Sequence, residues 1–261
     1  MVFKIQTLRQ SPLFNDCLME CIGVKCASEE EHIYVPNGNW LTKKKIYSAE
    51  MEIDFSNAVT LLNVNPSIRL NFKKKILPAL KDKQIDKKLL LSHFYKLVES
   101  ELKSYSNIIN TSLYNSYELV YNPPGSLYTG FDYSKKKLIG LHIDVHESLP
   151  VTEAFSGFSL LNINIGDCER YFYFVDLTPL ELLKKVDISL ENTDKIYNIA
   201  HYNLKNKFFE KFPNYPILRL KILPDQAYIA TTQAIIHDGG VNTMGFPDFT
   251  FLIPGKFKCI H

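Results

Sequence analysis

Arginine is scarce in this chain of 261 residues: of 30 basic residues, only Arg9, Arg69, Arg170 and Arg219 are arginines. Acidic residues number 28, so the formal net charge is only +2. A domain dedicated to nucleic acid is normally far more basic, so we expect no nucleic-acid partner. The sequence also lacks an apolar run of about 18 residues, and its first residues lack the basic flank and apolar core of a signal peptide. We therefore expect a cytoplasmic protein that does not enter a membrane.

Cysteine is also infrequent and irregularly placed. There are five cysteines, and the first three, Cys17, Cys21 and Cys26, are separated by three and four residues. An odd number with irregular spacing argues against a disulfide framework and indicates a reducing compartment. The gaps also differ from the two-residue gap of a zinc knuckle. The cysteines are best interpreted as small apolar residues.

Apolar residues make up 46% of the chain and aromatic residues 13%, which excludes disorder. Residues 1 to about 65 alternate short apolar runs with turn signals, which favours strands and loops. Between residues 72 and 105, leucine and other apolar side chains recur every three to four residues, which predicts an amphipathic helix. We expect residues 1–115 to form N-terminal strands and a helical support that packs on the core.

Residues 116–261 read mainly as strands. Runs rich in aromatic and β-branched residues, broken by Gly, Pro and Asp, predict strands at 117–121, 137–143, 158–165, 171–177, 217–223, 228–232 and 249–253. A mainly helical insertion is expected at about 179–213. Because the helices do not alternate with the strands, the sequence predicts an α+β, mainly β fold of the jelly-roll, cupin-like type, built as one compact unit.

Two histidines stand where predicted strands end. His142 and Asp144 are two residues apart, so in an extended segment both side chains project to the same face. His237 follows a second strand and precedes Asp238, Gly239 and Gly240, which we expect to form a turn. Two imidazoles and one carboxylate leave positions on a metal ion open, the arrangement of non-haem Fe(II) oxygenases. We therefore predict His142, Asp144 and His237 as metal ligands.

The segment from about residue 117 to 256, with its HxD at His142–Asp144 and its distal His237, resembles the Fe(II)/2-oxoglutarate-dependent oxygenases. The resemblance implies a double-stranded β-helix, Fe(II) as the metal held by the three catalytic ligands, and 2-oxoglutarate and O2 as co-substrates. It also implies hydroxylation of an unactivated C–H bond in a small molecule, an amino acid or biosynthetic intermediate, with release of succinate and CO2.

The sequence departs from this family at one position. Members commonly place an arginine shortly after the distal histidine to bind the distal carboxylate of 2-oxoglutarate, but here Asp248 stands there. A guanidinium pairs with a carboxylate better than an ammonium does, so we expect an arginine from an earlier strand to replace it. Arg170 is favoured, Arg219 is the second candidate and Lys256 the third.

Further polar residues are candidates for contact with the keto acid or substrate: Asn162 and Asn164 on one strand, and Thr232 before His237. His146 and Glu147, which follow the HxD, are either loop residues or contacts around the metal. Two other functions remain open. The same ligands could serve an Fe(II) oxidase or oxygenase that uses no 2-oxoglutarate, which would explain Asp248. The chain could also be a non-catalytic jelly-roll binding or sensor protein. Substrate, reaction outcome (hydroxylation, desaturation or cyclisation) and oligomeric state are left open.

Overall fold

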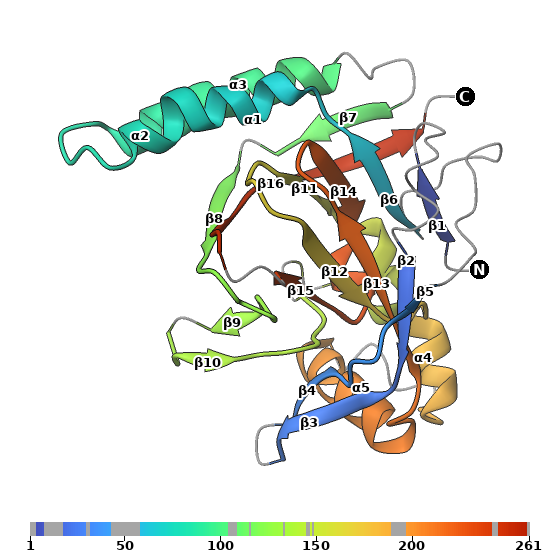
Figure 1. Cartoon of the computed structure of the whole chain (residues 1–261). Helices are drawn as coiled ribbons and strands as arrows, with labels where there is room; N and C mark the ends of the chain where they lie inside the picture. Colours follow the sequence, from blue (N-terminus) through green and yellow to red (C-terminus); the bar gives the residue numbers. More distant parts are fainter. Residues whose placement is uncertain are drawn as a thin grey trace.

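Two β-sheets face each other in the computed structural model, and helices cover their outer faces (Figure 1). The structure describes residues 4–7, 18–29, 32–42, 58–103, 109–114, 116–132, 134–144, 147, 149–188, 197–241 and 245–259. No helix in this described part of the chain has the length and apolarity needed to cross a bilayer.

The larger sheet, sheet A, has the strand order β1 (Lys4–Thr7), β6 (Ala58–Asn63), β14 (Gln226–Ala230), β11 (Ser159–Asn164), β16 (Asp248–Cys259) and β7 (Ile109–Leu113). The first half of β16 pairs instead with β8 (Glu118–Asn122). The pair β1–β6 is parallel, and the other pairs of sheet A are antiparallel.

The smaller sheet, sheet B, is antiparallel and has the order β15 (His237–Val241), β12 (Arg170–Phe174), β13 (Pro216–Ile222), β2 (Leu18–Ile22) and β5 (Leu41–Thr42). Apolar side chains fill the space between the sheets. They include Leu18, Leu61, Phe172, Phe174, Leu220 and Ala230. This arrangement is a double-stranded β-helix with supporting helices, so the predicted fold class is confirmed.

Alternation along each strand separates the inner face from the outer face. On β11, Leu161 and Ile163 point to the helices outside, whereas Asn162 lines a cavity between the sheets. The outer face of sheet A is covered by α1 (Pro66–Asn71), a π-helical turn (Phe72–Ile76), α2 (Leu77–Ala79) and α3 (Lys87–Lys103). The outer face of sheet B packs against α4 (Pro179–Lys185) and α5 (Tyr197–Lys211).

Two short hairpins complete the fold: β3 (Val24–Ser28) with β4 (Ile33–Pro36), and β9 (Phe131–Asp132) with β10 (Lys137–Leu138). The sequence predicts a strand over 137–143, but β10 ends at Leu138. The cause is Gly140, whose φ of +69° and close approach to the Tyr34 carbonyl suit only glycine. The chain then continues as a loop that carries His142 and Asp144.

The expected turn at Asp238–Gly240 is wrong, because these residues belong to β15. Five residue pairs with β12 hold this strand in place, among them Phe172 opposite Gly239. Strand pairing has overridden the local preference of two glycines for a turn. The expected helix over 72–105 is in fact two helical segments, separated at residues 80–86.

The N-terminal part of the chain contributes strands to both sheets. Strand β6 lies between β1 and β14 in sheet A, and β2 lies between β13 and β5 in sheet B. Strands β1, β2, β5, β6 and β7 all precede residue 115 and are hydrogen-bonded into the same two sheets as later strands. The division at residue 115 stays a prediction.

Candidate metal centre and its cavity

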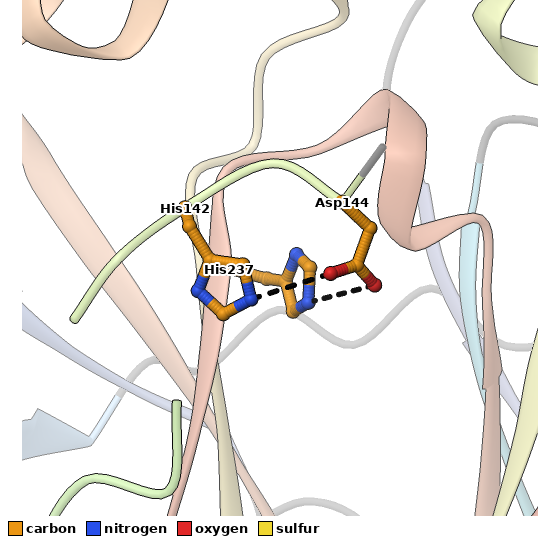
Figure 2. Close-up of side chains that lie close together, drawn as sticks. All are labelled: His142, Asp144 and His237. Atoms are coloured by element: carbon orange, nitrogen blue, oxygen red, sulfur yellow. Dashed lines mark ion pairs between the residues drawn. The ribbon is translucent and has the colours of Figure 1, made fainter. Parts of the chain in front are cut away.

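His142, Asp144 and His237 lie together at one side of the space between the sheets (Figure 2). One ligand atom from each residue can be chosen so that all lie within 4.8 Å of one another. The His142 Nε2 is 3.3 Å from Asp144 Oδ1, and the His237 Nε2 is 3.6 Å from Asp144 Oδ2. Figure 2 shows both Nε2 atoms and the carboxylate turned toward one another.

Backbone pairing brings these three residues together. His142 and His237 form an isolated antiparallel bridge with two hydrogen bonds: His142 N donates to His237 O (2.9 Å) and His237 N to His142 O (2.7 Å). Asp144 N in turn donates to the carbonyl of Thr232 at 3.3 Å. Backbone hydrogen bonds thus join the segment His142–Asp144 to residues 232–237, which explains why residues so distant in sequence meet.

The other nitrogen of each imidazole is occupied. His142 Nδ1 is 2.6 Å from Gly140 O, and His237 Nδ1 is 3.1 Å from Ile235 O. A carbonyl accepts only from a protonated nitrogen, so a neutral ring at either position carries its proton on Nδ1 and leaves the lone pair of Nε2 for a metal. This arrangement is found for metal-binding histidines. The donor set therefore fits a transition metal such as Fe(II).

The electrostatics of the centre are seen in the pKa shifts of two residues, Asp238 and His142. Burial raises the pKa of Asp238 to about 6, against the opposing effects of His142 and of backbone N–H donors, including those of Gly130 and Gly239. For His142, burial is the largest effect and lowers the pKa, but the hydrogen bond and negative charge of Asp144, together with Asp238, raise it overall. The site therefore attracts positive charge, which a metal cation satisfies.

A cavity of about 270 Å³ adjoins the three residues. Its buried polar part is lined by Asn122, Asn162, Arg170 and Thr250. A second part of the lining is apolar and partly open to solvent; it consists of Val120, Phe131, Ile139, Leu160 and Leu252. The exposed Glu118 lies beside these side chains. Tyr228 and Thr232 also line it. The cavity thus has a metal end, a buried polar end and an apolar opening.

Arg170 is the cation of the polar end, and only 4% of it is exposed. Its Nη1 donates to Asn162 Oδ1 at 3.0 Å and lies 3.7 Å from Asp248 Oδ2. Asp248 is fully buried and accepts a 2.9 Å bond from Asn122 Nδ2. The Nε of Arg170 has no hydrogen-bond partner among the described residues. The guanidinium is therefore held through Nη1, and its Nε is a buried donor without an acceptor among the described residues.

Asp248 stands out in the sequence only as the residue that replaces an arginine. In the structure it is the counter-ion of Arg170, and Asn122 and Thr250 also contact its Oδ2. The sequence predicts neither Asn122 nor the Asp248–Arg170 pairing. No local pattern signals either, because three separate strands supply these residues.

The other candidates lie elsewhere. Arg219 does not line the cavity: its guanidinium stacks between Trp40 (4.3 Å) and Tyr171 (4.5 Å) on the outer face of sheet B. Asn164 is buried, and its amide bonds only to backbone groups, the carbonyls of Cys168 and Ile222 and the N–H of Gly166. Lys256 is exposed on β16, and His146 lies outside the described residues.

Neither a protein-family model nor a curated protein matches the sequence. Among solved structures, the fold is similar to that of the Kdo hydroxylase KdoO, a non-heme Fe(II) alphaketoglutarate dependent dioxygenase. Its complex with succinate and Fe(III) is 14% identical over 80% of this chain and 86% of that chain, with a TM-score of 0.43. The complex with alphaketoglutarate and Fe(III) gives the same values. The complex with cobalt(II) is 13% identical, with the same coverage and TM-score. An identity this low carries no information on substrate or catalytic residues, which must come from this chain's own side chains.

Proposed function

We propose that the protein is a non-haem Fe(II)/2-oxoglutarate-dependent oxygenase that hydroxylates an unactivated C–H bond of a small molecule. The observation that carries the proposal is the combination of two imidazole Nε2 atoms and one carboxylate at one end of a cavity with a buried arginine at its polar end. A cluster of two histidines and one carboxylate is common by itself, and so is a buried arginine. Together they provide a site for a metal and a site for an acidic co-substrate in one cavity.

His142, Asp144 and His237 would hold the iron through two Nε2 atoms and a carboxylate oxygen. Iron supplies the redox chemistry by which O2 is activated at the expense of 2-oxoglutarate, which leaves as succinate and CO2. The chain contributes the orientation of the ligands: the carbonyls of Gly140 and Ile235 hold the Nδ1 protons, so that neither ring can turn away.

Arg170 would bind the distal carboxylate of 2-oxoglutarate. Its Nη1 is bonded to Asn162, whereas its buried Nε has no acceptor among the described residues, so an anion bound at the polar end of the cavity would supply the missing acceptor. Binding there is strengthened because Arg170 is almost wholly removed from water. Asp248 compensates the charge of Arg170 before the anion arrives, which explains how a lone arginine is tolerated in this position.

The apolar opening of the cavity would receive the substrate. Five partly exposed apolar side chains face it, and a volume of about 270 Å³ suits a small molecule in addition to the co-substrate. Thr232 lines the same cavity and is suited to contact either ligand.

The proposal is tested by turnover. Metal-free protein is given Fe(II), 2-oxoglutarate and O2, and succinate is measured with and without a panel of small-molecule substrates. We expect succinate formation that requires all three components and is abolished in His142→Ala. Iron binding with O2 consumption that does not depend on 2-oxoglutarate would instead identify an Fe(II) oxidase or oxygenase that uses no 2-oxoglutarate. Failure of the wild-type chain to bind iron would favour a non-catalytic binding protein.

A further inference from the structure

A cluster of three residues outside the cavity joins the segments that carry the metal ligands. Its members are Glu147, Gln233 and Gly157, which come from the loop after Asp144, the turn before His237 and the segment before β11. None of the three lines the cavity. The cluster therefore cannot act on substrate directly, but it is placed to control where Asp144 lies.

Hydrogen bonds fix the loop in two places. At its start, Asp144 N donates to the carbonyl of Thr232. Three residues later, the Glu147 carboxylate accepts a 2.9 Å bond from Gln233 Nε2. Thr232 and Gln233 are neighbours in one 3-10 turn (Thr232–Ala234), so both ends of the Asp144–Glu147 segment are attached to the same short element.

That turn is itself well anchored. Thr231, which precedes it, shares a 2.6 Å hydroxyl hydrogen bond with Ser159 of β11, and both residues are buried. The same Glu147 oxygen that holds Gln233 also accepts the N–H of Phe158, beside Ser159. The loop, the turn and β11 are thus joined at a single carboxylate.

Gly157 provides the space for this junction. A Cβ at this position would lie 1.6 Å from Gln233 Nε2 and 2.4 Å from Glu147 Oε2. The backbone of Gly157, with φ of −70° and ψ of −175°, is open to any residue. The space above Gly157 is filled by side-chain ends and not by backbone, so a side chain at this position would displace the ends of Glu147 and Gln233.

We propose that Glu147 and Gln233, passing over Gly157, form a clamp that positions Asp144 for metal binding. This inference rests on the metal centre of the proposed function. The three are positioning residues: Gln233 is 3% exposed, and Asp144 and Glu147, three residues apart in the chain, are each hydrogen-bonded to the same 3-10 turn. Without the clamp, the carboxylate must be ordered as the metal binds, and this ordering reduces affinity.

The experiment measures Co(II) binding to the full chain, by titration and by the ligand-field absorption of the bound ion. In Gln233→Glu two carboxylates face each other, and in Gly157→Ala the clamp is forced open. Each should weaken Co(II) binding about tenfold and alter the spectrum, since supporting contacts around metal ligands commonly have effects of this size. The matched control is Gly245→Ala, where a Cβ meets nothing within 4 Å, and its affinity should equal that of the wild type.

A double variant separates positioning from a loss of folding. In Glu147→Gln/Gln233→Glu the amide and carboxylate exchange places, so two carboxylates no longer face each other, although the amide at position 147 cannot serve both Phe158 and position 233 with the one atom that serves them in the wild type. Affinity should therefore recover in part, by about threefold over Gln233→Glu. Two results would overturn the clamp. One is wild-type Co(II) affinity in both Gln233→Glu and Gly157→Ala, and the other is a double variant that binds Co(II) as weakly as Gln233→Glu does. If the wild type itself binds no Co(II), the proposed metal centre is wrong and the clamp falls with it.

Discussion

Arg170 and Arg219 lie on adjacent, paired strands of sheet B, yet their surroundings are opposite. Arg170 opens β12 on the inner face, beside Asn162 and Asp248, and lines the cavity. Arg219 lies on β13 opposite Tyr173, and its guanidinium is enclosed by the rings of Trp40 and Tyr171. Both guanidinium groups have a buried Nε without a partner among the described residues, but one lines the cavity beside polar side chains and the other stacks between two aromatic rings away from it.

The difference comes from strand alternation. On β12, Arg170 shares the inner face with Phe172 and Phe174, which lie in the core between the sheets. On β13, Leu218 and Leu220 occupy that inner face, so Arg219 between them must point outward. The parity of a residue within its strand therefore decides whether an arginine faces the cavity or the outer face of the sheet. Four predictions test this contrast.

The largest effect is expected from Arg170→Met. Loss of a charge-assisted contact should weaken 2-oxoglutarate binding about 100-fold while Co(II) or Fe(II) affinity stays unchanged. Isothermal titration of both ligands measures this. Because the single variant leaves Asp248 buried without its counter-ion, Arg170→Met/Asp248→Asn is the matched variant that keeps the chain stable. Full 2-oxoglutarate affinity in the double variant would exclude Arg170 as the anchor.

Asp248→Asn should change ligand affinity and stability in opposite directions. Removing a buried negative charge beside the anion site should strengthen 2-oxoglutarate binding several-fold, because Asn162 still holds Arg170. The free energy of unfolding should fall by about 2 kcal/mol, since Arg170 loses its counter-ion. Urea unfolding and ligand titration on one preparation report both quantities. Weaker binding would show that Asp248 chiefly orients Arg170.

Arg219→Met should affect stability only. The stacks on Trp40 and Tyr171 and the contact with the Met19 thioether are lost, at a cost of about 1 kcal/mol. Metal and 2-oxoglutarate affinities should equal those of the wild type. A loss of 2-oxoglutarate affinity comparable to that of Arg170→Met would remove the distinction between the two arginines.

Lys205 is compared with the two arginines because, unlike them, it can lose its proton. It is 6% exposed, donates to the carbonyl of His32 and lies over the ring of Tyr34, and burial lowers its pKa from 10.5 to about 8. Below pH 8 the folded protein bears the cost of a buried ammonium. That cost fades as pH rises from about 8 toward 10.5, because only the unfolded chain still holds the proton. The stability advantage of Lys205→Met over the wild type should therefore shrink by about 2 kcal/mol between neutral pH and about pH 9.5. An advantage independent of pH would contradict this.

The sequence predicts the features that are local in the chain. The strands β8, β11, β12, β13 and β14 follow from their composition, and His142 and Asp144 lie close together because only one residue separates them. The alternation of side chains in ILRLKIL (residues 217–223) also indicates that Arg219 points to the outer face of the sheet. The features that no sequence pattern predicts depend on pairing between distant segments. Examples are β15 with its glycines, the insertion of β2 and β6 into the sheets, and the Asp248–Arg170 pair.

The central claim is that one cavity binds a metal at His142, Asp144 and His237 and a keto acid at Arg170. The most direct measurement is the visible absorption of the anaerobic protein during addition of Fe(II) and then 2-oxoglutarate. We predict a charge-transfer band that requires both additions, is absent in His142→Ala and needs far more 2-oxoglutarate in Arg170→Met/Asp248→Asn than in Arg219→Met. A protein that binds Fe(II) but develops no band at any 2-oxoglutarate concentration would contradict the account.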